Sequence, residues 1–163
     1  MSLEIPFDPY LLPARVLAPD EGKTLRVLTD RMRVVLDSDA TEGRLALLEV
    51  ESPAGAGVPL HAHANEDEVF RVLAGVYEFT VGDEVVRAGP GTTVFAPRGA
   101  LHGYRAPGPA SARMLVTVTP GGLEGMFVLL DRLGRAGALD QAALRRVTAR
   151  FGVHFAPAAA HAA

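Results

Sequence analysis

The chain of 163 residues contains no cysteine and sets 16 basic against 19 acidic side chains, which leaves a formal net charge of −3. Its length suits one domain with its own apolar core. The absence of cysteine excludes disulfides, thiolate metal sites and cysteine nucleophiles. Because the sequence has no concentrated basic run, no secretory leader and no apolar stretch of about 18 residues, we expect a cytoplasmic protein that binds neither nucleic acid nor a membrane.

The whole chain, 1–163, is predicted to be one domain with three parts. Residues 1–23 contain four prolines, which is typical of an extended arm because proline lacks a backbone donor and fixes φ. A β-rich region is predicted over 24–119, and a helical cover over 120–152.

Short runs of aliphatic and β-branched residues alternate with glycine, proline and aspartate in the β-rich region. Such runs, bounded by turn residues, predict strands. Val81–Glu84 and Gly89–Gly91 are predicted turns, since glycine admits positive φ and proline presets its own. The predicted strands lie at 24–29, 31–37, 43–51, 58–63, 67–73, 76–81, 84–88, 92–96, 102–106 and 112–118. Many short strands with regular turns are typical of a β-sandwich or a barrel.

Helical periodicity begins after Pro120. Apolar residues at steps of three and four predict a helix over 123–133. Its apolar face carries Leu123, Met126, Phe127, Leu130 and Leu133. A second helix is predicted over 139–150, with Asp140 at or near its N-terminus and Gly152 after its end. The first helix is expected either to cover a barrel opening or to form a dimer contact.

Three of the five histidines form a pattern with Glu68. His61 and His63 are two residues apart in a predicted strand, so their rings lie on one face with Cα atoms roughly 6–7 Å apart. Glu68 opens the next strand after a short polar loop. His102 follows a later turn, on a strand that lies beside the first one if the barrel closes. The four side chains are therefore the predicted ligands of one metal ion.

The chemistry of this ligand set limits the metal. Three imidazoles and one carboxylate suit a divalent transition metal, whereas Ca²⁺ and Mg²⁺ prefer oxygen ligands. The candidates are Fe, Mn, Ni, Co, Cu and Zn. Four protein ligands leave one or two open positions on a five- or six-coordinate ion, and an open position is what catalysis requires.

Two segments resemble the motifs of the cupin family. The first motif is matched by Gly55-x5-His61-x-His63-x4-Glu68-x6-Gly75, and most of the second by Gly91-x5-Pro97-x-Gly99-x2-His102. Ala106 stands where the second motif ends in asparagine. That asparagine is not a metal ligand in the family pattern, so the departure concerns the local turn and not the metal.

The resemblance implies an all-β fold, the double-stranded β-helix or jelly-roll cupin barrel, with C-terminal α-helices and a metal near one mouth. The His-x-His-x4-Glu spacing and the run Thr119-Pro120-Gly121-Gly122 before a helix are similar to single-domain, quercetin-dioxygenase-like cupins. By that likeness Glu68 is both metal ligand and catalytic proton acceptor, and the protein is expected to form a homodimer.

Five aromatic residues near the motifs are candidate substrate contacts: Phe70, Tyr77, Phe79, Phe95 and Tyr104. Each one taken singly is more simply a core residue, because side chains fill the interior of small barrels. Together they predict an apolar pocket for an aromatic or otherwise hydrophobic small molecule.

Three functions are compatible with these features. The first hypothesis is a metal-dependent dioxygenase acting on a small aromatic or enolisable substrate. The second is a non-oxidative metal-dependent isomerase or lyase, in which the metal polarises a carbonyl. The third is a non-catalytic cupin that binds a small molecule, since one fold supports many functions.

Overall fold

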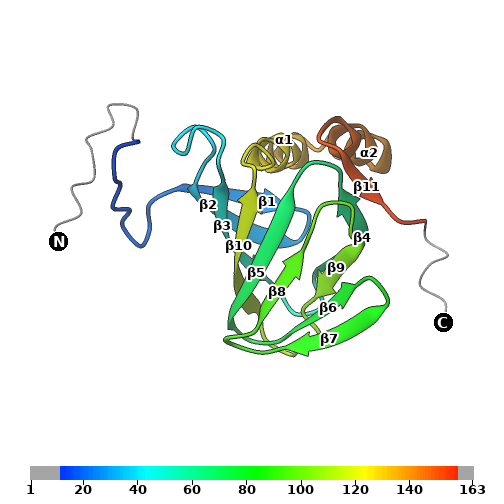
Figure 1. Ribbon diagram of the computed structural model, residues 1–163. Coiled ribbons are helices and arrows are strands. Elements are labelled where there is room, and N and C mark those ends of the chain that lie inside the picture. Colours follow the sequence, from blue (N-terminus) through cyan, green and yellow to red (C-terminus); the bar gives the residue numbers. More distant parts are fainter. Residues whose placement is uncertain (1–11, 158–163) are drawn as a thin grey trace, which may run out of the picture.

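Two antiparallel sheets face each other in the computed structural model, which describes residues 12–157 (Figure 1). The larger sheet has the strand order β1 (Lys23–Val27), β2 (Asp30–Leu36), β3 (Ala46–Ser52), β10 (Ala112–Thr119), β5 (Asp67–Ala74) and β8 (Thr93–Ala96). The smaller sheet has the order β11 (Val153–Phe155), β4 (Gly57–His63), β9 (His102–Arg105), β6 (Tyr77–Val81) and β7 (Glu84–Ala88). This arrangement is the predicted double-stranded β-helix.

The core lies between the two sheets, where every second residue of a strand points inward. In β10 the buried residues are Ala112, Met114, Val116 and Val118, and the residues between them are more exposed. The short aliphatic and β-branched runs in the sequence predicted all ten strands from β1 to β10 to within a few residues. Within the predicted arm, residues 12–22 carry no helix or strand, Lys23 begins β1, and the rest lies outside the described residues.

A β-bulge in β4 sets the direction of the side chains that follow it. In the pairing of β4 with β9, Val58 lies opposite Tyr104, but His61 lies opposite His102, so β4 contains one extra residue. Proline is tolerated at bulges because it donates no ladder hydrogen bond, and Pro59 lies within this one. Owing to the bulge, Val58 and His61 line the same cavity although they are three residues apart.

The two strands also approach each other closely beyond the bulge. A Cβ atom on Gly103 would lie 2.8 Å from the carbonyl oxygen of Val58, which leaves no room for a side chain. Glycine at position 103 therefore allows β9 to bring the neighbouring His102 against β4.

Both helices lie over one end of the barrel (Figure 1). α1 (Glu124–Arg135) is tied to β1 by a hydrogen bond of 2.7 Å from the backbone amide of Arg26 to Asp131 Oδ1. α2 (Gln141–Arg150) begins at the predicted cap, where Asp140 Oδ1 accepts a 2.6 Å hydrogen bond from the amide of Ala143. In the described part of the chain, neither helix has the length and apolar character that a membrane crossing requires.

A short strand that was not predicted from the sequence, β11, follows α2. Gly152 has a φ of 72°, which reverses the chain after the helix. β11 then pairs with β4, placing Val153 opposite His63 and Phe155 opposite His61. The C-terminal segment thus forms part of the wall around the histidines.

Candidate metal centre

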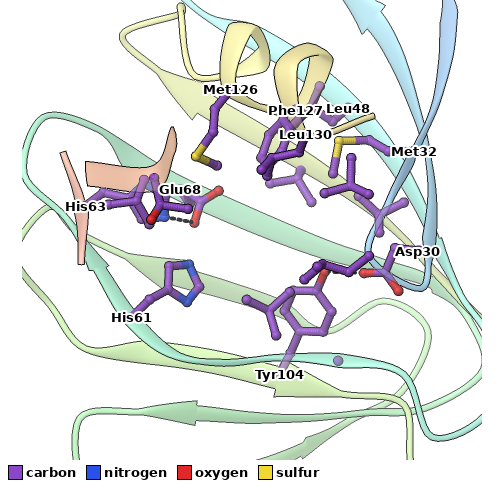
Figure 2. Close-up of a pocket in the computed structure, with 18 of the residues that line it drawn as sticks. Asp30, Met32, Leu48, His61, His63, Glu68, Tyr104, Met126, Phe127 and Leu130 are labelled. Carbon is purple, nitrogen blue, oxygen red and sulfur yellow. Dashed lines mark hydrogen bonds and ion pairs between the residues drawn. The ribbon is translucent and has the colours of Figure 1, made fainter. Parts of the chain in front are cut away.

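The four predicted metal ligands converge inside the barrel. His61 and His63 come from β4, His102 from the adjacent strand β9, and Glu68 from β5 in the opposite sheet. One ligand atom from each residue lies within 4.8 Å of the others. All four side chains are buried, with exposed fractions of 7% or less. Figure 2 shows His61, His63 and Glu68 at one end of a cavity.

Backbone carbonyls orient two of the three histidine rings. Nδ1 of His61 donates to the carbonyl oxygen of Pro59 at 2.9 Å, and Nδ1 of His102 donates to that of Ala100 at 3.0 Å. Since a carbonyl only accepts, Nδ1 carries the proton in both rings. The Nε2 atoms are therefore the metal-binding atoms.

The third ring faces a carboxylate instead of a carbonyl. Nδ1 of His63 lies 3.6 Å from Oε2 of Glu66, and both side chains are buried. A carboxylate behind a ligating histidine fixes its ring and increases its basicity. Glu66 lies in the short loop between β4 and β5, and its burial raises the pKa of its carboxyl group.

Glu68 occupies the middle of the cluster. Its Oε2 lies 2.9 Å from Nε2 of His102 and 3.1 Å from Nε2 of His63. Burial raises the pKa of Glu68, but the close contacts with His102 and His63 outweigh burial and bring the pKa well below its usual range. Glu68 is therefore a carboxylate, the form that binds a metal ion.

The donor set fits a transition-metal ion. Three imidazole nitrogens and one carboxylate oxygen meet in a buried site, which matches the preference of divalent transition metals. Within residues 12–157, neither ring nitrogen of His63 makes a hydrogen bond of standard geometry. Buried polar atoms without partners are rare, and a metal bound to Nε2 would satisfy one of these two.

An apolar cavity of about 80 Å³ adjoins the cluster (Figure 2). α1 contributes Met126, Phe127 and Leu130 to its wall, and β11 contributes Phe155. α1 thus forms part of the cavity wall at the end of the barrel, while the homodimer stays a prediction. Ligand pockets commonly measure about 300–1,000 Å³, so a ligand larger than a few atoms must displace side chains of this cover.

Residues 48–118 match the model of the cupin domain family. The chain therefore contains a cupin domain. No curated protein matches it in sequence. This match agrees with the resemblance to cupins that the two sequence motifs indicated.

Solved structures show the same fold. KdgF from a Halomonas species has a TM-score of 0.62 at 21% identity, with 69% of this chain and 99% of that chain covered. A predicted oxalate decarboxylase from Thermotoga maritima has a TM-score of 0.59 at 20% identity, with coverages of 65% and 99%. For the polyketide cyclase RemF from Streptomyces resistomycificus the TM-score is 0.57 at 24% identity, with coverages of 66% and 80%. At these identities the likeness shows the fold alone.

The five aromatic candidates for substrate contact lie in different places in the structure. Phe70 and Tyr104 line the cavity. Tyr77 and Phe79 are buried between the sheets and pack against Tyr104, outside the cavity lining. Phe95 is 57% exposed, so the expectation that it lines the pocket is wrong. The next residue on β8, Ala96, is buried and pairs with inward-facing Glu68. Because side chains alternate along a strand, Phe95 points outward.

Metal affinity of the cupin centre is expected to fall as the pH drops, because a ligating Nε2 must be free of a proton. Burial and the charge of His102 lower the pKa of His61 to about 4, so this ring stays neutral. For His102, burial lowers the pKa, but the hydrogen bond and charge of Glu68 outweigh it and raise the pKa above 6.5. Protons therefore compete with the metal first at His102.

Titration calorimetry with Zn²⁺ in two buffers of different ionisation enthalpy measures this competition. We expect proton release on binding and a steady loss of affinity between about pH 8 and about pH 5. A constant affinity over that range would show that the metal binds elsewhere.

Proposed function

We propose that this cupin is a metal-dependent dioxygenase that acts on a small, mainly apolar substrate with a hydroxyl or enolisable group. The observation that carries the proposal is the position of Glu68, a buried carboxylate between two histidines at one end of an apolar cavity. We assign His61, His63, Glu68 and His102 as the ligands of one divalent transition metal.

The chain's own residues have separate tasks in this reaction. A metal held by the four ligands supplies Lewis acidity and, when redox-active, electron transfer to O₂. Glu68 accepts the proton of the substrate hydroxyl at a carboxylate oxygen. Phe70 and the residues of α1 hold the apolar skeleton beside the centre and exclude water, which strengthens the electrostatic interactions inside.

A second candidate function uses the same carboxylate without oxygen. Glu68 is held close to two histidines in a buried site, an arrangement that also suits proton transfer in an isomerase or lyase. The names of two similar structures, a predicted oxalate decarboxylase and a polyketide cyclase, describe reactions of this broader kind. Their likeness supports the fold, so the choice between the two functions depends on experiment.

Oxygen dependence distinguishes the candidates. The protein is loaded separately with Fe²⁺, Mn²⁺, Co²⁺ and Ni²⁺ and given flavonols, diols and β-diketones in an oxygen-electrode cell. We expect oxygen uptake with at least one pair of metal and substrate class, and none in the metal-free protein. Equal turnover with and without oxygen would favour the non-oxidative reaction, and binding without turnover would reduce the protein to a small-molecule-binding cupin.

A further inference from the structure

The cavity contains a second set of polar side chains away from the metal centre. Asp30 and Tyr104 lie at one end of it, and His61, His63 and Glu68 lie at the other, as Figure 2 shows. Most of the wall between these two ends consists of aliphatic, methionine and phenylalanine side chains. The cavity is therefore polar at both ends and apolar in the middle.

Asp30 enters the cavity from a hairpin. It is the first residue of β2, directly after the turn at residues 28–29, and it pairs with Val27 on β1. Only 5% of its surface is exposed. Oδ2 accepts a hydrogen bond of 2.7 Å from the hydroxyl of Tyr104. Oδ1 is buried and accepts no hydrogen bond of standard geometry from the described residues.

Stability of the fold does not explain this carboxylate. Burial raises the pKa of Asp30 by more than the nearby hydroxyl groups of Tyr104 and Ser52 lower it, so the charged form is destabilised here. A buried acceptor without a partner destabilises a protein, whereas apolar residues of the same shape are often neutral at such a place. A bound molecule that donates to Oδ1 would remove this deficit.

Tyr104 fixes the distance between the two ends. It is two residues from His102 on the inward face of β9, which places the two Cα atoms roughly 7 Å apart. Burial raises the pKa of Tyr104 well above 10, and the charge of Asp30 raises it further, so its hydroxyl remains a donor. The same strand therefore carries one residue of the metal centre and the residue that holds Asp30 in place.

We propose that Oδ1 of Asp30 accepts a hydrogen bond from a hydroxyl group of the bound substrate, whose other end reaches the metal centre. This inference rests on the proposed function and narrows its substrate class. The substrate is a mainly apolar molecule with a metal-binding oxygen at one end and a hydroxyl at the other. A hydroxyl has one donor to satisfy, whereas an ammonium would leave further N–H groups unpaired against the apolar wall.

Two matched catechols test the proposal on protein loaded with Co²⁺. Both bind metal through the catechol oxygens, but 4-(hydroxymethyl)catechol carries a hydroxyl that 4-methylcatechol lacks. We expect the hydroxymethyl compound to bind about tenfold more tightly, the effect of one hydrogen bond to a charged group. In Asp30→Leu this ratio should fall to about one, with unchanged cobalt content and unchanged affinity for 4-methylcatechol.

A matched control variant shows whether the change in ratio is specific to Asp30. Asp131→Asn changes another buried carboxylate outside the cavity and should keep the tenfold ratio. Equal binding of the two catechols by the wild type, or an unchanged ratio in Asp30→Leu, would overturn the role of Asp30. If instead the proposed metal-dependent function is wrong, the result is different: neither catechol would then change the absorption spectrum of the bound Co²⁺.

The metal-free protein tests the same proposal without any ligand. The double variant Asp30→Leu, Tyr104→Phe replaces both partners of the buried hydrogen bond by apolar groups of similar shape. If the pair serves binding and not folding, the melting temperature of this double variant should stay within about 3 °C of that of the wild type. A much larger decrease would assign the pair a structural role and contradict the proposal.

Discussion

Replacing His102 by alanine is expected to remove the metal from the cupin centre. The substitution deletes one of four ligands and also leaves Glu68 without its 2.9 Å partner. Loss of a residue that merely supports a ligand commonly weakens metal binding about 10- to 100-fold, so loss of a ligand should weaken it by more than about 100-fold. Elemental analysis after gel filtration should find about one metal per wild-type chain and almost none in the variant.

His154 provides the matched control for this experiment. It is exposed on β11 and pairs with Ala62, the residue between His61 and His63, but its side chain points away from the cavity. His154→Ala should therefore keep the full metal content. His63→Ala should behave like His102→Ala. Full metal content in either of these two ligand variants, with folding verified by circular dichroism, would reject the assigned site.

Replacing Glu68 by glutamine is expected to abolish most of the activity while part of the metal binding survives. Glutamine has nearly the same shape and retains an oxygen, but it carries no charge and accepts no proton at neutral pH. General-base catalysis commonly contributes about 100- to 10,000-fold to a rate. We therefore expect a loss of turnover in this range, measured at equal metal occupancy with a substrate found in the oxygen-electrode assay.

Glu78→Gln is the control for the same chemical change. Glu78 lies on β6 and pairs with Arg105 at the surface, where neither residue lines the cavity. Its variant should retain wild-type turnover. If Glu68→Gln at full metal occupancy also retained wild-type turnover, Glu68 would be a ligand only and the proposed proton transfer would be wrong.

Much of the fold follows from local patterns in the sequence. Short aliphatic and β-branched runs bounded by turn residues, such as the run at 112–118, identified the strands. The capping residue Asp140 identified the start of α2. The spacing of His61, His63 and Glu68 identified the centre because it encodes both strand parity and a short connecting loop.

Other features depend on contacts that are distant in sequence. Phe95 was assigned to the interior from its place near His102, but the pairing of β8 with β5 determines its direction. Asp30 has no motif around it, and only the closed barrel brings it to Tyr104, 74 positions away. β11 is too short to show a period, and its pairing with β4 defines it. These parts of the site required the three-dimensional structure.

Anomalous X-ray diffraction from crystals of the metal-loaded protein, measured at the absorption edge of the metal, tests the central claim most directly. We predict one anomalous peak per chain, roughly 2.0–2.2 Å from Nε2 of His61, His63 and His102 and from a carboxylate oxygen of Glu68. A peak at any other position, or no peak in protein that elemental analysis shows to contain metal, would contradict the assignment of this centre.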